Sequence, residues 1–428
     1  MVFRSFYGSS EPGTTFHDRC NPVESVAPPF ISILPSNMTL NGRPSNSWNR
    51  RGFLRKTFGA CWAGASLLEQ SILRANQANS QAGSSPTPNL FNIEKIADGI
   101  YAAIARPVAL INCNAAIFEN AHDLLIVDTH SKPSAAIALV AQIRREITNK
   151  PVRYIVNSHF HWDHTQGNHG YKRIAPEADI VASEPTRQLL SKMAEPRLKA
   201  SIEEAQKSLE TYRQQLATAQ TAEERTHFQN AVREATDYIA EMRAFTPELP
   251  NITFERDLII HDRAHDLHLA FRGRGHTAGD VVVFCPQKKV VATGDLLHGF
   301  APFLTDSYPF EWPRTLLYVA ELDFDHVIGG HAGVQHSKDR LYQMGAFIEE
   351  LTDQVTTLQR KGQNAEQIKA AIKPEQLTSL ATGGYGDFLA ESLRQYRFHS
   401  PADKVADIVP KALADCIDQT LAALENSK

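Results

Sequence analysis

Two patterns of hydrophobic residues, one typical of strands and one typical of helices, alternate along this chain. Short apolar runs rich in β-branched residues predict strands at residues 91–96, 99–104, 124–127, 152–156, 290–294 and 327–328. Between two of these runs, apolar residues recur every three or four positions from Ile137 to Ile147, which predicts a helix over 133–148 with Pro133 in its first turn. This order of strands and helix occurs before residue 164 and partly recurs after residue 252. It favours an α/β fold in which two mixed sheets form a sandwich flanked by helices.

Two longer segments carry helical patterns alone. Residues 184–247 are rich in Ala, Gln, Glu, Lys and Leu, which favour helices. Thr221 and Glu224 form a capping box that would open a second helix, so we expect an antiparallel helical hairpin inserted into the sandwich. The hairpin would pack on the sheet or form the interface of a homodimer, and a lid over a binding site is the alternative. Residues 336–428 predict further amphipathic helices, with a stripe at Ile348, Leu351, Val355 and Leu358 and a last helix over 402–424.

The densest chemistry lies in the stretch His159-Phe160-His161-Trp162-Asp163-His164. It follows the predicted strand 152–156, and α/β folds usually carry functional residues at the carboxyl ends of strands. Imidazole and carboxylate groups are ligands of zinc and similar ions. His159 and His161 point the same way in extended backbone, whereas the adjacent Asp163 and His164 diverge. This pattern suits one metal held by the first pair and a second metal held by the last pair.

Six residues cannot complete two coordination shells, so we expect further ligands downstream. Three segments place a histidine or a carboxylate after a strand-like run, namely Gly275-His276-Thr277, Thr293-Gly294-Asp295 and Gly329-Gly330-His331. Each of them alone could be a turn. Together they can converge on one sheet edge, where glycine lets the backbone approach a metal closely.

The ordered set of motifs resembles the metallo-β-lactamase superfamily of metallohydrolases over residues 91–335, apart from the insertion. The resemblance implies a four-layer αββα sandwich. It implies a first metal held by His159, His161 and His276, and a second metal held by Asp163, His164 and His331. Asp295 would bridge the two ions. Asp128, at the end of strand 124–127, would be the family's acidic residue beneath the site, bonded to an outer histidine nitrogen.

Asp295 narrows the choice among the branches of the superfamily that the chain resembles. Zinc β-lactamases of the Cys-containing type carry cysteine here, and other β-lactamase types lack the bridging carboxylate. Lactonases, thioester hydrolases of the glyoxalase II kind and phosphodiesterases are more similar, and the flavodiiron branch differs because it replaces a motif histidine. The substrate bond stays open among ester, lactone, thioester, amide and phosphoester. A β-lactamase-like antibiotic hydrolase, a persulfide dioxygenase-like enzyme with one iron, and a non-catalytic interaction protein are the alternatives.

The implied cofactor is a pair of divalent metal ions, with zinc expected and manganese or iron as alternatives. Two ions about 3.5–4 Å apart can share a hydroxide and polarise the bond to be hydrolysed. Asp163 would ligate the second ion and also orient that hydroxide, which makes it the expected catalytic residue. The chain contains no Gly-x-Ser-x-Gly turn that would supply a serine nucleophile.

Aromatic residues near the motifs predict an apolar substrate pocket. Phe160 and Trp162 lie inside the histidine motif, and Phe300, Phe303 and Trp312 follow Asp295 on a loop that contains proline. The alternative for the last three is that they bury the loop itself.

Composition excludes some partners. The chain is 42 % hydrophobic and 21 % charged, as is usual for globular proteins. Its net charge of −4 offers no basic surface for nucleic acid, so we expect a small-molecule substrate.

Cys113 and Cys285 lie in apolar runs, which favours buried free thiols over a disulfide framework.

The N-terminal segment Asn49-Arg50-Arg51-Gly52-Phe53-Leu54 is similar to a twin-arginine export signal. The apolar run 57–68 is too short to span a membrane as a mature helix, and residues 80–82 offer a cleavage site. We therefore expect residues 1–82 to be removed from a periplasmic or secreted protein with no membrane anchor, leaving 83–335 as the metal-binding domain. Residues 1–37 are predicted to be disordered, and Met38 would place the arginine pair at a normal distance from a start. A basic amphipathic helix on a cytoplasmic protein is the alternative.

Overall fold

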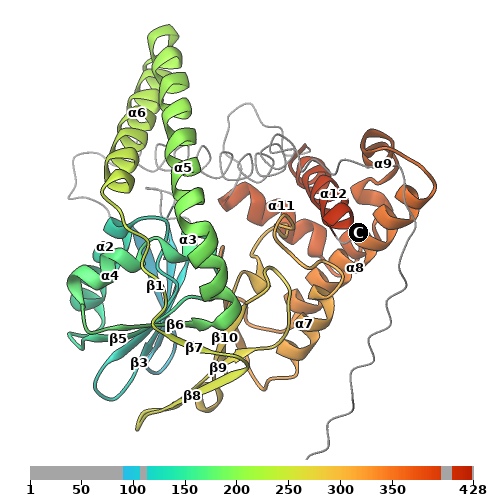
Figure 1. Ribbon diagram of the computed structural model, residues 1–428. Helices are drawn as coiled ribbons and strands as arrows, with labels where there is room; N and C mark the ends of the chain where they lie inside the picture. The colour runs from blue at the N-terminus through green and yellow to red at the C-terminus, as the bar shows by residue number, and fades with distance from the viewer. Residues whose placement is uncertain (1–89, 107–112, 397–406, 427–428) are drawn as a thin grey trace, which may run out of the picture. The chain divides into compact units, whose positions relative to one another are not determined.

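Two mixed β-sheets form the centre of the fold (Figure 1). The computed structural model describes residues 90–106, 113–396 and 407–426. The first sheet has the order β1-β2-β3-β4-β5-β6-β7, antiparallel up to β4 and parallel from there on. Its strands are β1 (Phe91–Ala97), β2 (Ile100–Ala105), β3 (Ala115–Glu119), β4 (Leu124–Val127), β5 (Val152–Val156), β6 (Asp179–Ser183) and β7 (Ile252–Phe254).

The second sheet has the order β12-β11-β10-β9-β8, with one parallel pair, β11 with β12. Its strands are β8 (Asp257–His261), β9 (Asp266–Phe271), β10 (Val281–Cys285), β11 (Val290–Gly294) and β12 (His326–Gly329). The predicted strands 124–127, 152–156 and 290–294 coincide with β4, β5 and β11. Their β-branched residues are buried within the sheets, which is why the local pattern located them so well.

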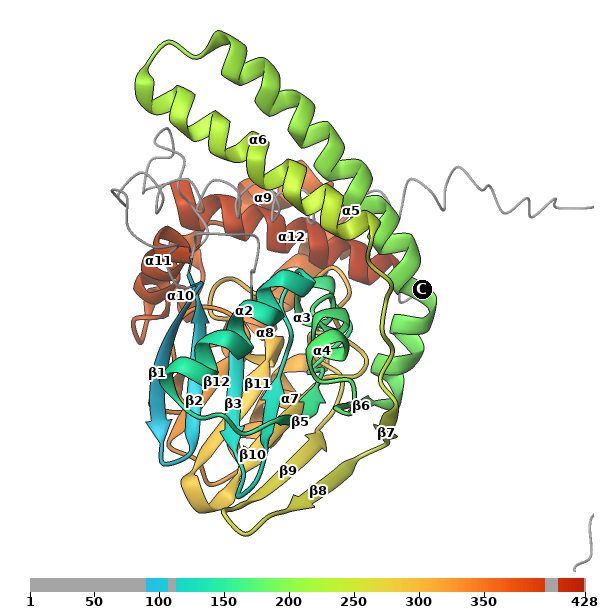
Figure 2. The same ribbon diagram turned by 90° about the vertical axis from the view of Figure 1, so that its left-hand side faces the viewer.

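Helices cover the outer face of each sheet, so the predicted four-layer αββα sandwich is confirmed (Figure 2). One core lies between the sheets and contains Ile100 and Val156 of the first sheet and Val283 and Ala292 of the second. A second core joins the first sheet to α2 (Pro133–Glu146) and α4 (Asn168–Ile174). A third joins the second sheet to α7 (Trp312–Ala320), α8 (Asp339–Arg360), α9 (Ala365–Ala371), α10 (Thr378–Ala381), α11 (Tyr385–Tyr396) and α12 (Ile408–Asn426).

The predicted helices form with small differences at their ends. The helix predicted over 133–148 ends at Glu146, and the stripe Ile348, Leu351 and Val355 is fully buried on α8. The last helix is described from Ile408, and residues 402–406 lie outside the described part of the chain.

The predicted hairpin consists of α5 (Glu184–Thr218) and α6 (Ala222–Arg243), which run side by side (Figure 1). Thr221 and Glu224 make both hydrogen bonds of the predicted capping box. The two helices share a core of their own, with Tyr212, Ala231 and Tyr238 at most 2 % exposed. The base of the hairpin is attached to the sandwich, because Glu241 accepts hydrogen bonds from both the backbone nitrogen and the hydroxyl of Ser134 on α2.

The expected export segment, with Arg50 and Arg51, and the expected cleavage site at 80–82 lie outside the described residues. Of the helices that are described, none combines the length and the apolarity that a membrane crossing requires.

Candidate metal centre

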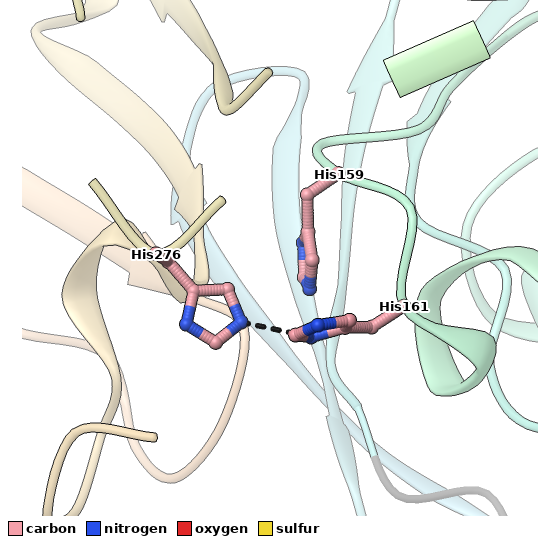
Figure 3. A group of neighbouring side chains, drawn as sticks. All are labelled: His159, His161 and His276. Atoms are coloured by element: carbon pink, nitrogen blue, oxygen red, sulfur yellow. Dashed lines mark hydrogen bonds between the residues drawn. The ribbon is translucent and has the colours of Figure 1, made fainter. Parts of the chain in front are cut away.

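The strand ends bring all seven predicted ligand residues together. His159 and His161 lie on the loop after β5, and His276 lies between β9 and β10. Each of these three histidines contributes a nitrogen within 4.8 Å of the other two. Figure 3 shows the three side chains pointing toward one another, with each pair of rings nearly perpendicular. The closest pair is His276 Nε2 and His161 Nδ1, at 2.9 Å. These three residues, called the first cluster below, are all buried.

A second cluster contains Asp163, His164 and His331, again with ligand atoms within 4.8 Å of one another. Asp163 and His164 do not diverge as adjacent residues in extended backbone would. They lie in the short helix α3 (Trp162–Thr165), where Asp163 Oδ2 is 3.7 Å from His164 Nε2 and 3.5 Å from His331 Nε2. The expectation failed because the chain turns into a helix immediately after His161.

Asp295 lies between the two clusters. Its Oδ2 is 3.5 Å from His276 Nε2 in the first cluster and 3.3 Å from His331 Nε2 in the second, while its Oδ1 is 3.4 Å from His164 Nε2. Burial acts to raise the pKa of Asp295, but the charges of His331, His164 and His298 hold it well below its ordinary value. The carboxylate is therefore ionised, and one group reaches both clusters.

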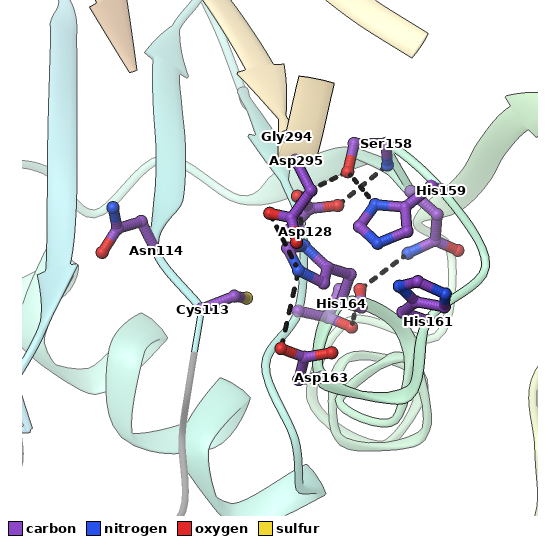
Figure 4. A network of polar contacts seen from close by, with 12 residues as sticks. Cys113, Asn114, Asp128, Ser158, His159, His161, Asp163, His164, Gly294 and Asp295 are labelled. Carbon is purple, nitrogen blue, oxygen red and sulfur yellow. Dashed lines mark hydrogen bonds and ion pairs between the residues drawn. The ribbon is translucent and has the colours of Figure 1, made fainter. Parts of the chain in front are cut away.

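Asp128 lies beneath the second cluster, where Figure 4 shows it beside His164 and Ser158. Its Oδ2 is 2.8 Å from His164 Nδ1 and accepts a hydrogen bond from the Ser158 hydroxyl at 2.7 Å. Its Oδ1 accepts from the Ser158 backbone nitrogen at 2.8 Å. Asp128 thus occupies the outer nitrogen of His164 and leaves Nε2 directed at the cluster.

Residues 109–331, just over half of the chain, match the family described as the Metallo-beta-lactamase superfamily. The chain belongs to the metallo-β-lactamase superfamily. A solved structure named "Metallo-beta-lactamase from Pontibacter korlensis" is similar at 16 % sequence identity, with a TM-score of 0.43, over 60 % of this chain and 98 % of that chain.

Metallo-β-lactamase superfamily members are generally metal-dependent hydrolases, and the site residues of this chain fit divalent ions. Among the described residues, His159 Nε2, His164 Nε2 and Asp295 Oδ1 are buried without a hydrogen-bond partner. Buried polar atoms of this kind need a partner, and each of the three belongs to a cluster. Burial also lowers the pKa of His159 and His276 well below the ordinary value. Both are thus neutral, which is the form of imidazole that binds metals.

The structure also assembles two residues that sequence patterns did not indicate. His298 Nε2 is 3.2 Å from Asp295 Oδ2, and His298 forms a further cluster with Asp295 and His331. Its one sequence signal is its position three residues after Asp295, across the 3₁₀ turn η2 (Asp295–Leu297). Asp306 Oδ2 is 3.0 Å from His161 Nε2 and 2.7 Å from Arg197 Nη2. No local pattern marks Asp306, because both of its partners are more than 100 positions away along the chain.

The five aromatic residues expected in a substrate pocket separate into two groups. Phe160 and Trp162 line a small pocket together with Leu190 and Phe245 of the hairpin region. The other three do not line it. Trp312 is fully buried in the core on the second sheet, where its indole nitrogen donates to the Leu296 carbonyl. The expectation of a pocket wall is therefore wrong for Trp312, because this ring supports the loop from beneath.

Phe300 and Phe303 lie against the cluster histidines. The ring of Phe300 is 4 % exposed and 5.2 Å from the ring of His331. The ring of Phe303 lies 5.8 Å from that of His161. Phe300 belongs to the same core as Trp312, so the expectation of a pocket wall is wrong for Phe300 as well. Phe303 is partly exposed, and its place in a substrate pocket stays a prediction.

Gly294 is required where β11 meets the site. Its φ of 51° lies in the left-handed region, and a Cβ here would meet Ser158 Oγ, the hydroxyl that holds Asp128. We expect Gly294→Ala to lower the free energy of unfolding by about 3–5 kcal/mol, from backbone strain and overpacking together. The control is Gly362→Ala, where φ is 81° but nothing lies within 4 Å, so the cost should be about 1–2 kcal/mol. Equal losses in urea unfolding would contradict the role of the Ser158 contact.

Proposed function

We propose that this protein is a dinuclear metal-dependent hydrolase, with zinc as the expected ion and manganese or iron as alternatives. The observation that carries the proposal is the position of Asp295, whose carboxylate lies between two clusters that each contain three further residues able to bind a metal. An enzyme with one iron would need only one of these clusters. When bound, a metal pair polarises a carbonyl or phosphoryl oxygen and makes water nucleophilic at neutral pH.

Asp163 is the proposed catalytic residue. Its Oδ2 lies nearest to His331 and His164, so this oxygen would hold a metal. The other carboxylate oxygen would then orient the attacking water and take its proton. Asp128 keeps His164 in one orientation, and Asp295 sets the spacing of the two clusters.

The proposed substrate is a small molecule with an ester, lactone, thioester, amide or phosphoester bond, and lactones and thioesters are favoured. The aspartate at position 295 supports this range, because the chain resembles lactonases and thioester hydrolases more than Cys-type β-lactamases. The test is hydrolysis by the metal-loaded protein of a panel of lactones, thioesters, phosphodiesters and β-lactams, with Asp163→Asn as the control variant. Turnover of at least one class by the parent and not by Asp163→Asn is expected. Equal turnover by both proteins would contradict the assignment of Asp163.

We also propose that the protein is exported by the twin-arginine route. Replacing Arg50 and Arg51 with lysine should leave the precursor in the cytoplasm of a bacterial host, because lysine keeps the charge but not the planar guanidinium. The matched control is Arg55→Lys, which changes a neighbouring arginine outside the pair. Cell fractionation measures the result, and normal accumulation of the double variant outside the cytoplasm would exclude this signal.

A further inference from the structure

A single carboxylate oxygen connects the inserted hairpin to the first cluster. Asp306, on the loop between β11 and α7, lies with Oδ2 3.0 Å from His161 Nε2. The same oxygen accepts a hydrogen bond from Arg197 Nη2 at 2.7 Å. Arg197 belongs to α5 of the hairpin, and its guanidinium also lies 4.6 Å from the centre of the Phe160 ring. The hairpin therefore contacts the metal-binding motif itself and does not pack only on the sheet.

The hydrogen bond from His161 decides which of its nitrogens faces the cluster. A neutral imidazole has one protonated nitrogen and one nitrogen with a lone pair. If Nε2–H donates to Asp306, the lone pair is on Nδ1, which is the atom 2.9 Å from His276 Nε2. Asp128 orients His164 in the same way, but there Nδ1 faces the carboxylate and Nε2 faces the second cluster. Each cluster thus has one histidine whose outer nitrogen is occupied by a carboxylate.

A carboxylate can orient a histidine only if it is itself held in place. Asp128 is held by two hydrogen bonds from Ser158. Asp306 is held by Arg197, and the two side chains are 24 % and 22 % exposed, so bulk water only partly screens their charges. Stacking on Phe160 restricts the guanidinium further.

We infer that Arg197 and Asp306 are positioning residues that orient the imidazole of His161, so that the inserted hairpin sets the affinity of the first cluster for its metal. This inference rests on the proposed function, since it requires that the first cluster binds a metal. The hairpin would then be neither a purely architectural element nor a mobile lid, because one of its side chains supports a metal ligand.

The test is the affinity of the purified protein for two equivalents of Zn²⁺, measured by competition with a chromophoric chelator. Loss of a carboxylate behind a ligating histidine typically weakens metal binding by about 10–100-fold. Asp306→Ala should weaken one of the two equivalents by this amount and leave the other unchanged, because Asp306 touches His161 and no residue of the second cluster. Arg197→Gln should weaken the same equivalent by a smaller factor, of about 3–10-fold.

A double-mutant cycle separates an effect through Asp306 from one through Phe160. If Arg197 acts through Asp306, Arg197→Gln should add no further loss of affinity in the Asp306→Ala protein. Arg213→Gln is the matched control, because Arg213 is an exposed arginine further along α5. It should bind both equivalents like the parent. The melting temperatures of the metal-free proteins should agree, and the visible spectrum of the Co²⁺ form should change only in the two site variants.

The outcomes separate the inference from the function on which it rests. If the parent takes up no Zn²⁺, the proposed function is wrong whatever the variants do. If the parent binds two ions and Asp306→Ala and Asp306→Asn bind both with unchanged affinity, the function stands and the inference is wrong. The inference is also wrong if Arg197→Gln weakens zinc binding as much in the Asp306→Ala protein as in the parent, because Arg197 would then not act through Asp306.

Discussion

Removal of divalent metal should abolish hydrolysis and lower the melting temperature, and two equivalents of Zn²⁺ per chain should restore both. Among the described residues, His159 Nε2, His164 Nε2 and Asp295 Oδ1 are buried without a hydrogen-bond partner, and buried polar atoms cost stability when nothing binds them. A ligand that binds only the folded state stabilises it by about 2.7 kcal/mol per site when its free concentration is 100 times its Kd.

Elemental analysis and calorimetry of the dialysed and reloaded protein measure these effects. Mg²⁺ is the control ion, because it prefers oxygen ligands and should not restore activity at a site whose predicted ligands include five imidazoles. Fully active protein that contains no more than one metal ion per chain would contradict the dinuclear assignment.

Substitution of Asp295 should affect both clusters at once, since it is the residue that contacts each of them. Asp295→Ala removes the only carboxylate among the predicted ligands that lies within 3.5 Å of both His276 and His331. We expect the variant to lose at least one metal ion and to fall in kcat by about 10³-fold, which corresponds to several kcal/mol of lost charge stabilisation. Asp295→Cys should keep the fold and rearrange the second metal, because a thiolate offers one soft donor in place of two oxygens.

Asp280→Asn is the matched control for Asp295. Asp280 is also a buried aspartate, but it bonds to Thr277 and belongs to neither cluster. Burial raises the pKa of Asp280 to about 7, and its two oxygens accept from the backbone nitrogen and the hydroxyl of Thr277. Asparagine keeps one oxygen for the backbone nitrogen, and its NH2 group can donate to the hydroxyl. Asp280→Asn should retain both ions. Unchanged metal content and turnover in Asp295→Cys would show that Asp295 does not bridge.

Local patterns were sufficient for the elements around the site. β4 and β5 begin and end where their apolar runs do, and the capping box at Thr221 opens α6 as predicted. These features depend on side-chain burial and on hydrogen bonds between residues three positions apart, so the local sequence is sufficient to predict them. The grouping of His159, His161 and His276 was also predictable, but only from the order of motifs that resembles a known superfamily.

Other parts of the site depend on contacts that no local pattern contains. Whether Asp163 and His164 diverge depends on where the chain turns into α3, and the structure places both side chains on the second cluster. The sequence left two places open for the aromatic residues on the loop after Asp295, a pocket wall and a buried core. An aromatic side chain is suited to both, because both environments are apolar. The core on the second sheet decided this for Trp312.

The sequence by itself determined the residue types of the centre, their order along the chain and the strand ends that carry them. The order of motifs also implied that Asp295 would lie between the two clusters. The tertiary structure alone decided that His298 lies beside Asp295 and that Arg197 meets Asp306 across 109 positions of sequence. The physical reason is the range of the interactions. Helix and strand patterns reflect neighbours a few residues apart, whereas a metal centre is assembled from side chains that become neighbours only when the two sheets pack together.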